Sequence, residues 1–423
     1  MIRFNMVASL RQVGRRIVKM MALLLFTLTV AVPGLAAPWI QTTSLPLGVS
    51  DHTMVYASGF LYHAGGVDSI NGESARVFYS QVQSNGTIGV WNETSPLPAV
   101  IRDHAGVTAN GFVYVLGGLQ LDTDGGYVTT NAVYYSKINT NASLGIWQPA
   151  IPLPQPALLF LSASVWNNRI YATGGWNGQT LINNVYSATI QADGSLSAWV
   201  TQRPLPVAIY AHAGVANGML YVFGGAINGG TTVTNKVYYA KINDDGTLGV
   251  WNETTPLPLP LNNHGAVAAG GRVYVMGGAI SGGFLANVHY SAPVAGDGSL
   301  GAWSAGPVLP YPEALFGLAV TDSHIFLSGG QGVQLTDSTV YSMALPLPPA
   351  APAIVSQSFT NGNFQLGFSA QTNTGFGLLA STNLTDWLRI SSGFTDTNGV
   401  LLLQDTNAAS FPRRFYRTFW PLP

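Results

Sequence analysis

A tryptophan recurs six times along the chain at nearly constant spacing, and such a period limits the chain to a repeat architecture. Successive tryptophans lie 52 or 56 residues apart, at Trp39, Trp91, Trp147, Trp199, Trp251 and Trp303. A Gly-Gly doublet recurs with them, at 65–66, 117–118, 174–175, 224–225, 277–278 and 329–330. Residues 39–345 therefore consist of six copies of one structural unit.

Each unit contains four short runs of β-branched and aromatic residues, which predict four strands. In the second unit these runs are 104–109, 112–116, 132–138 and a last strand that opens at Gly145. Asn-Gly and Asp-Gly pairs between the runs are typical of tight hairpin turns. Four strands in a unit of this length are the blade of a β-propeller.

The doublet, a later tyrosine and the tryptophan together resemble the kelch repeat. The resemblance implies an all-β fold, a six-bladed kelch-type β-propeller over residues 37–345. An extra hairpin, such as 245–249, precedes the tryptophan, so the partner roles of intracellular kelch proteins do not carry over directly. Galactose oxidase resembles this fold too, but its Cys–Tyr cofactor cannot form in a chain without cysteine, and we predict no cofactor.

The ends of the repeat region predict how the ring closes. Trp39 belongs to a fourth strand with no first three strands before it, and the sixth unit stops after its third strand near 345. We expect the strand at Trp39 to complete the sixth blade, because closure removes exposed sheet edges.

The first 36 residues are typical of a secretory signal peptide. Five of the 17 basic residues lie in the first 19 positions, an apolar run follows at 20–32, and small residues precede a cleavage site after Ala36. The run is too short to span a bilayer, which takes about 20 residues. We expect an exported protein, periplasmic, cell-surface or secreted, with no stable membrane span after cleavage. A twin-arginine signal and an uncleaved anchor stay open.

A second, smaller domain follows the propeller. Residues 346–353 form a Pro-rich linker, and residues 354–423 contain five predicted strands, at 363–369, 375–381, 386–391, 400–405 and 413–419. The segments 381–387 and 411–417 resemble a small β-sandwich module that ends many secreted bacterial proteins. An attachment or glycan-contact role and a passive spacer role are both open for it.

Composition excludes one class of partner. Charged residues make up only 8% of the chain, and from residue 37 onward 18 acidic residues outnumber 12 basic ones. Nucleic acid binding needs a basic face that neutralises phosphates, so we expect no nucleic acid partner.

The candidate site lies on the face where the loop before each inner strand meets the loop between the second and third strands, because function tends to sit on loops held by a rigid scaffold. Four units place a histidine at one position there, with polar residues before it. These side chains either surround the channel mouth, for ligand contact or acid–base work, or hydrogen-bond the backbone between blades. The candidates are Asp51, His52, Arg102, Asp103, His104, Trp176, Tyr210, His212, Asn262, Asn263, His264 and Glu313.

We predict no metal site. Histidines on different blades lie too far apart for ligand bonds near 2 Å, and the acidic loop with Asp122 and Asp124 lacks the glutamate of a calcium loop. Asp-Gly-Ser hairpins such as 193–195 resemble the aspartate boxes of sialidases, but Asx-Gly turn chemistry explains them. A sialidase also gathers several arginines, whereas Arg102 is the only arginine expected at the mouth.

The first functional hypothesis is a non-catalytic scaffold that binds a glycan or an envelope protein through the channel mouth. A sugar-processing enzyme is the alternative, because the kelch family includes a periplasmic N-acetylneuraminate mutarotase and Arg102, Glu313 and the histidines could serve such a reaction. A third hypothesis is a purely structural surface protein.

Overall fold

The computed structural model describes residues 38–419, apart from 122–123, 125, 333–334, 347–352, 370–374 and 383–387. The expected signal peptide lies outside these residues. Across the described ranges the regular elements are β-strands and one short 3₁₀ turn, η1 (Ala408–Ser410). The described part of the chain contains no helix long and apolar enough to cross a membrane.

Six antiparallel sheets of four strands, called blades one to six, follow one another along the described chain, and β22 (Thr232–Val233) extends the fourth. From the inner to the outer strand, blade one contains β3 (Thr53–Ala57), β4 (Phe60–Ala64), β7 (Val77–Gln81) and β8 (Asn92–Thr94). Blade two contains β10 (Ala105–Ala109), β11 (Phe112–Leu116), β14 (Val133–Lys137) and β15 (Gln148–Pro149). Blade three contains β16 (Ser162–Trp166), β17 (Arg169–Thr173), β18 (Val185–Thr189) and β19 (Val200–Thr201). Blade four contains β20 (Tyr210–Ala216), β21 (Met219–Ile227), β23 (Val237–Lys241) and β24 (Asn252–Thr254). Blade five contains β25 (Gly265–Ala269), β26 (Arg272–Met276), β27 (His289–Pro293) and β28 (Ser304–Ala305). Blade six contains β29 (Gly317–Val320), β30 (His324–Ser328), β31 (Val340–Ala344) and β1 (Ile40–Gln41).

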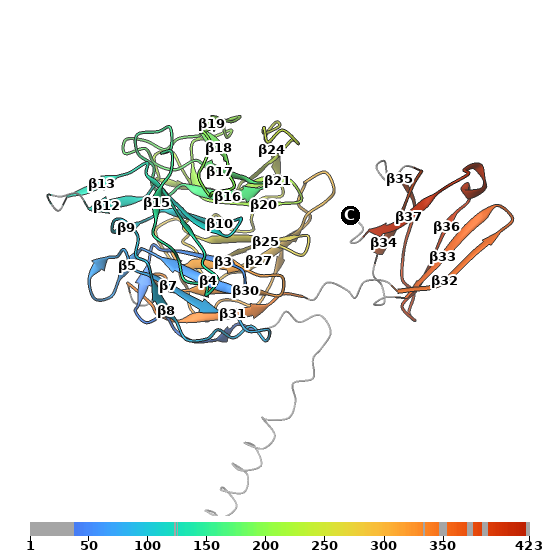
Figure 1. The fold of residues 1–423 in the computed structure, drawn as a ribbon, viewed down its shortest axis with the longest axis horizontal. Coiled ribbons are helices and arrows are strands. Elements are labelled where there is room, and N and C mark those ends of the chain that lie inside the picture. The colour runs from blue at the N-terminus through green and yellow to red at the C-terminus, as the bar shows by residue number, and fades with distance from the viewer. Residues whose placement is uncertain are drawn as a thin grey trace, which may run out of the picture. The chain divides into compact units, whose positions relative to one another are not determined.

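The sheets close into a ring. Strand β1 pairs antiparallel with β31, so the expected N-terminal closing strand is present (Figure 1, where β31 in orange lies beside the blue strands). Each inner strand contacts the inner strand of the next blade, and β29 of blade six contacts β3 of blade one. A closed ring leaves no blade with an unpaired neighbour, which is how a propeller avoids exposed edges.

The Gly-Gly doublets join neighbouring blades. In every blade the second glycine donates its N–H to a carbonyl of the next blade, over 2.7–2.9 Å; the pairs are Gly66–Ile101, Gly118–Leu158, Gly175–Ile209, Gly225–Leu261, Gly278–Glu313 and Gly330–Val49. The first glycine lies under the same carbonyl: a Cβ on Gly174 would lie 2.3 Å from the oxygen of Ile209. Both glycines of each doublet have positive φ. Close approach and backbone conformation therefore both require glycine.

The repeated tryptophans join the outer edges. Each indole Nε1 donates to a carbonyl of the preceding blade over 2.9–3.1 Å, from Trp39 to Pro307, Trp91 to Thr43, Trp147 to Ser95, Trp199 to Ile151, Trp251 to Arg203 and Trp303 to Thr255. Apolar side chains fill the seams; one cluster contains Val107 and Tyr114 of blade two with Ile170 and Ala188 of blade three. The period in the sequence thus reflects contacts between blades.

The Asp-Gly-Ser hairpins are structural. The Asp193 carboxylate accepts the N–H and the hydroxyl of Ser195 at 3.0 and 2.7 Å, as an Asx turn does. The same turn presents the carbonyl of Gly194, which accepts the Tyr114 hydroxyl of blade two at 2.8 Å. The aspartates therefore stabilise turns whose glycine carbonyls join neighbouring blades, as turn chemistry predicts.

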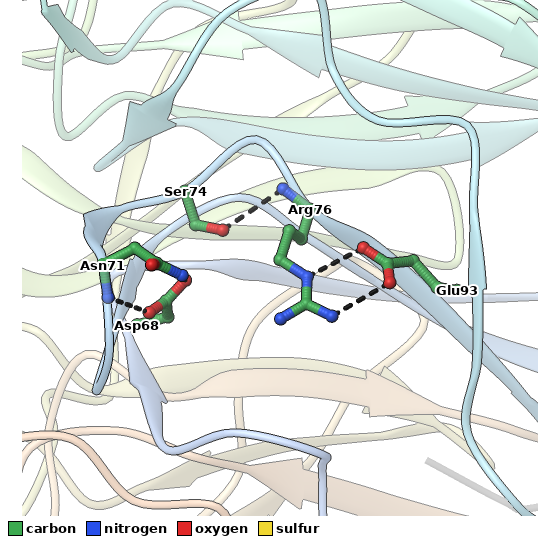
Figure 2. A network of polar contacts seen from close by, with 5 residues as sticks. All are labelled: Asp68, Asn71, Ser74, Arg76 and Glu93. Atoms are coloured by element: carbon green, nitrogen blue, oxygen red, sulfur yellow. Dashed lines mark hydrogen bonds and ion pairs between the residues drawn. The ribbon is translucent and has the colours of Figure 1, made fainter.

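One face of the propeller carries the loop before each inner strand and the loop after each second strand, and we call it the loop face. Two small sheets lie on this face. One contains β2 (Val49–Ser50), β5 (Val67–Asp68) and β6 (Gly72–Glu73); the other contains β9 (Ile101–Arg102), β12 (Leu119–Leu121) and β13 (Tyr127–Thr129). Figure 2 shows the turn at Asp68, and beside it Arg76, whose Nε donates to Glu93 at 2.7 Å. Arg76 is thereby held at the outer part of blade one.

The C-terminal domain consists of two three-stranded sheets, one more strand than predicted. They contain β32 (Ala353–Thr360), β33 (Asn363–Ser369), β36 (Val400–Asp405) and β35 (Leu388–Phe394), β34 (Gly375–Ser381), β37 (Phe415–Phe419). Apolar side chains from both sheets, such as Leu366 and Leu378, form one core. Strand β32 was missed because it follows directly on the Pro-rich segment. In the 411–417 segment, Arg414 and Tyr416 bind Asp405, at 2.9 and 3.0 Å, so part of that motif is structural.

Candidate functional site

A cavity of about 200 Å³ lies on the loop face, and the beginnings of all six inner strands line it. Its wall includes Asp51, Asp103, Phe160, Tyr210, Asn263 and Leu315. Four of these residues, Asp51, Asp103, Tyr210 and Asn263, are among the candidates from sequence. Phe160 and Leu315 are not, although the repeat spacing that aligns Asp51 with Asp103 also leads to them.

One repeated backbone feature creates this wall. The residue directly before the histidine position has positive φ in five blades, with φ of 56° at Asp51, 54° at Asp103, 54° at Phe160, 50° at Asn263 and 56° at Leu315. Backbone hydrogen bonds connect them around the mouth: Phe160 N–H donates to Asp103, Asp103 to Asp51, Asp51 to Leu315 and Leu315 to Asn263, over 3.0–3.2 Å. Blade four differs, because β20 begins at Tyr210 with a bulge before His212.

One side of the cavity is acidic. Asp51 and Asp103 stand on adjacent blades, and the Asp51 carboxylate accepts hydrogen bonds from Ser50 Oγ at 2.6 Å and Gln331 Nε2 at 3.2 Å. Burial and, after it, the neighbouring Asp51 raise the pKa of Asp103 well above its ordinary value. Asp103 therefore keeps its proton to a higher pH than an ordinary aspartic acid does.

The other side is aromatic and amide-bearing. The rings of Phe160 and Tyr210 lie 5.2 Å apart, between centroids, on blades three and four. Asn262 Nδ2 donates to the Tyr210 hydroxyl at 3.1 Å, while Asn263 lines the cavity itself. The cavity therefore combines aromatic side chains with hydrogen-bonding groups, the combination found in sites for small polar ligands.

Arg102 lies behind the acidic wall, outside the cavity lining. Its guanidinium is between two carboxylates, with Nε 3.8 Å from Asp103 Oδ2 and Nη1 3.7 Å from Glu73 Oε1. The Tyr127 ring, 5.2 Å away, covers it, and the Tyr127 hydroxyl donates to Glu73 at 2.6 Å. Arg102 thus lies against two acidic groups. Its neighbours Glu73 and Tyr127 were not among the sequence candidates.

The four histidines lie in the seams between blades. His52, His104 and His212 contribute to the cavity wall, whereas His264 is 1% exposed and does not. His52 Nε2 contacts Ser328 Oγ of blade six at 3.0 Å. One hypothesis from the sequence was that the histidines bond the backbone of a neighbouring blade, whereas this contact is made to a side chain. Burial lowers the pKa of all four, so they are neutral at pH 7.

Two candidates lie away from the mouth. Glu313, 2% exposed, occupies the position at which the other blades carry Val49, Ile101, Leu158, Ile209 and Leu261. Burial, with Asp337 nearby, raises the pKa of Glu313 to about 8. Trp176 is half-buried, and its backbone forms isolated antiparallel β-bridges with Leu159 and with Leu181 on the loop face. It is not part of the cavity wall.

These features define a β-propeller with a cavity at the loop-face end of its inner strands. Residues 160–345 match the family model of the KLHDC2/KLHL20/DRC7 Kelch-repeats domain. The repeats within residues 160–345 are therefore similar to kelch repeats.

Known relatives are similar over part of their length. Human Kelch repeat and BTB domain-containing protein 12 is 30% identical over 185 residues, which are 39% of this chain and 28% of that protein. Kelch-like protein 41a of Danio rerio is 24% identical over 188 residues, 44% of this chain and 30% of the relative. The chain therefore spans less than half the length of these relatives. The solved structure of YjhT aligns with 71% of this chain and 96% of its own, with a TM-score of 0.57 and 14% identity.

Proposed function

We propose that this propeller is an exported binding scaffold and that its ligand is a glycan seated in the loop-face cavity. The observation that carries the proposal is the pairing of an acidic wall, Asp51 and Asp103, with an aromatic wall, Phe160 and Tyr210, in one cavity. Carboxyl oxygens accept hydrogen bonds from sugar hydroxyls, while aromatic rings cover the apolar face of a sugar ring.

The charge of the cavity favours a neutral glycan. Its lining contains two carboxyl groups and no lysine or arginine, and the nearby Arg102 is already paired with Asp103 and Glu73. An acidic sugar would bring a further negative charge close to these groups, which costs free energy in a partly dry site.

A glycan array with residues 37–423 tests the proposal. We expect saturable binding to neutral glycans, and we expect Tyr210→Ala to abolish it. Phe284→Ala is the matched control, because Phe284 is an aromatic residue that is 71% exposed and lies outside the cavity wall. If no glycan binds while the loop face captures an envelope protein, the scaffold role holds and the ligand class is wrong.

One observation supports a sugar-processing enzyme as the second candidate. Asp51 and Asp103 both line the cavity, and burial raises the pKa of Asp103, so Asp103 can give a proton while a second carboxyl group is present to accept one. Exchange between sugar anomers needs both transfers. Exchange NMR on free reducing sugars would detect it, and Asp103→Asn should then remove the acceleration; rates equal to those in buffer would exclude this candidate.

A further inference from the structure

We infer that Phe160 is the residue on which the ligand stacks, and that one terminal neutral pyranose residue occupies the cavity with its apolar face on this ring. The inference rests on the proposed glycan-binding function and specifies the sugar unit, its orientation and the residue that selects it.

The backbone of Phe160 is in a conformation that its side chain disfavours. Its φ is 54°, and the N–H bond from Phe160 to Asp103 keeps it in the ring of backbone bonds around the mouth. Short polar residues such as Asp and Asn tolerate this region, and Asp51, Asp103 and Asn263 fill three of the equivalent positions. A bulky aromatic residue there is an outlier, and such outliers cluster at functional sites.

Packing does not account for the ring. Phe160 is half-exposed, and it belongs to none of the hydrophobic clusters formed by the described residues. Its one aromatic neighbour is Tyr210, at 5.2 Å, which is also outside those clusters and is held by Asn262. The strained residue therefore lines the cavity beside a second aromatic ring.

The rest of the cavity limits the ligand. Asp103 of the adjacent blade two and Asp51 of blade one line the same cavity as Phe160, so a bound sugar meets hydrogen-bonding carboxyl groups as well as an aromatic ring. The C–H bonds on one face of a pyranose are slightly positive and match the negative face of an aromatic ring. The volume of about 200 Å³ is below the roughly 300–1,000 Å³ of pockets for drug-sized ligands, which leaves room for one sugar unit.

The test replaces Phe160 with the residue that blade five carries at the same position, Phe160→Asn. The probes are methyl β-D-galactopyranoside, methyl β-D-glucopyranoside and N-acetylglucosamine, each titrated by calorimetry and followed by saturation-transfer NMR. We expect the wild type to bind at least one of them, with the strongest transfer to the C–H protons of one ring face. The variant should bind at least about tenfold more weakly, a loss of about 1.4 kcal/mol.

The same variant should be more stable than the wild type, by about 2 °C in melting temperature, because Asn relieves the backbone conflict. Ser58→Asn is the matched control: Ser58 has φ of 52° in an exposed turn and is not part of the cavity wall. It should gain stability as well and keep its affinity within about threefold. Phe160→Tyr should keep both the strain and the binding.

Two results overturn the inference while the proposed function stands: wild-type affinity in Phe160→Asn, or a lower melting temperature with an unfolded fraction that explains the lost binding. If the wild type binds none of the three probes and no glycan on the array, the proposed function fails and this inference fails with it.

Discussion

The backbone N–H of Gly330 donates a 2.7 Å hydrogen bond to the carbonyl oxygen of Val49, and this bond joins blade six to blade one. It is the sixth member of a set in which every blade makes the same bond to its successor. Strand β1 adds a second connection between the ends, because Ile40 pairs with Ser342. The ring is therefore closed both at its inner loops and at its outer edge.

Deletion of residues 38–44 should open the ring. The deletion removes β1, leaves the edge of β31 unpaired and eliminates the Trp39 bond to Pro307. An exposed edge strand promotes aggregation. We expect loss of cooperative thermal unfolding and higher-order species in size-exclusion chromatography. A monomeric deletion variant with the melting temperature of the wild type would mean that β1 is not needed for closure.

Substitution of a doublet glycine should lower stability mainly because a Cβ would clash with the carbonyl of the next blade, and less because the backbone has positive φ. Gly174 and Gly270 have nearly equal φ, 58° and 56°, but a Cβ would lie 2.3 Å from Ile209 O at Gly174 and would meet nothing within 4 Å at Gly270. Gly270→Ala should cost about 1 kcal/mol of unfolding free energy, from φ alone. Gly174→Ala should cost at least about 2 kcal/mol more, because the blade seam must shift. Chemical denaturation measures both; equal losses would contradict the seam contact.

Glu313 should make stability depend on pH. Its pKa in the folded protein is about 8, raised first by burial and then by Asp337, whereas an unfolded glutamate titrates near 4.5. Between these values the folded state holds a proton that the unfolded state has lost, so this group's contribution to stability is complete below about pH 4.5 and declines as pH rises toward 8. Tyr341 is a further group that interacts electrostatically with Glu313.

Glu313→Leu supplies the kind of residue that Leu158 and Leu261 provide in other blades, and it should remove that pH dependence. We expect the variant to gain more over the wild type at pH 8 than at pH 5, by at least about 1.4 kcal/mol, the equivalent of one pKa unit. Glu253→Gln is the control, because Glu253 is an exposed partner of Lys236. A gain that is the same at both pH values would show that Glu313 is not held neutral in the seam.

Much of the fold could be predicted from the sequence because its repeated residues make contacts between blades. The tryptophans and doublets mark bonds that each blade makes once, so their period gives the sheets and the closing strand. The residues of the candidate site were harder to predict from the sequence than the fold. The repeat pattern predicts Glu313 at the mouth, but Glu313 is buried at the position that Val49 occupies in blade one. An error of one or two residues in the repeat alignment changes the direction in which a side chain is expected to point. The backbone of the folded protein is needed to show which residue before each inner strand has positive φ.

The residues that sequence reasoning missed are apolar or distant in the chain. Phe160 and Leu315 gave no chemical signal, since a search for polar side chains passes over them. Glu73 and Tyr127 come from loops of blades one and two, and only the small loop-face sheets bring them to Arg102. Repeat alignment reveals which positions correspond, whereas loop conformation decides which of them meet.

Arg102 provides the last prediction, because its position separates two kinds of ligand. Its guanidinium interacts with Asp103 and Glu73 at 3.7–3.8 Å and is absent from the cavity wall. Arg102→Ala should therefore leave the affinity for a neutral glycoside within about threefold of the wild type. The variant should also raise the pKa of Asp103, since Arg102 is the one neighbour that lowers it. NMR titration of the carboxyl carbon would measure that change.

Arg102→Lys is the matched variant for this experiment, because it keeps the charge and loses the planar group beneath Tyr127. The Asp103 pKa should move less in Arg102→Lys than in Arg102→Ala if charge is the cause. Acidic sugars test the opposite hypothesis. If one of them binds the wild type and binds Arg102→Ala at least about tenfold more weakly, Arg102 is a carboxylate anchor and the cavity is not a neutral-glycan site. Unchanged affinity for neutral and acidic sugars alike, with a raised Asp103 pKa, would leave Arg102 the single role of balancing the acidic wall.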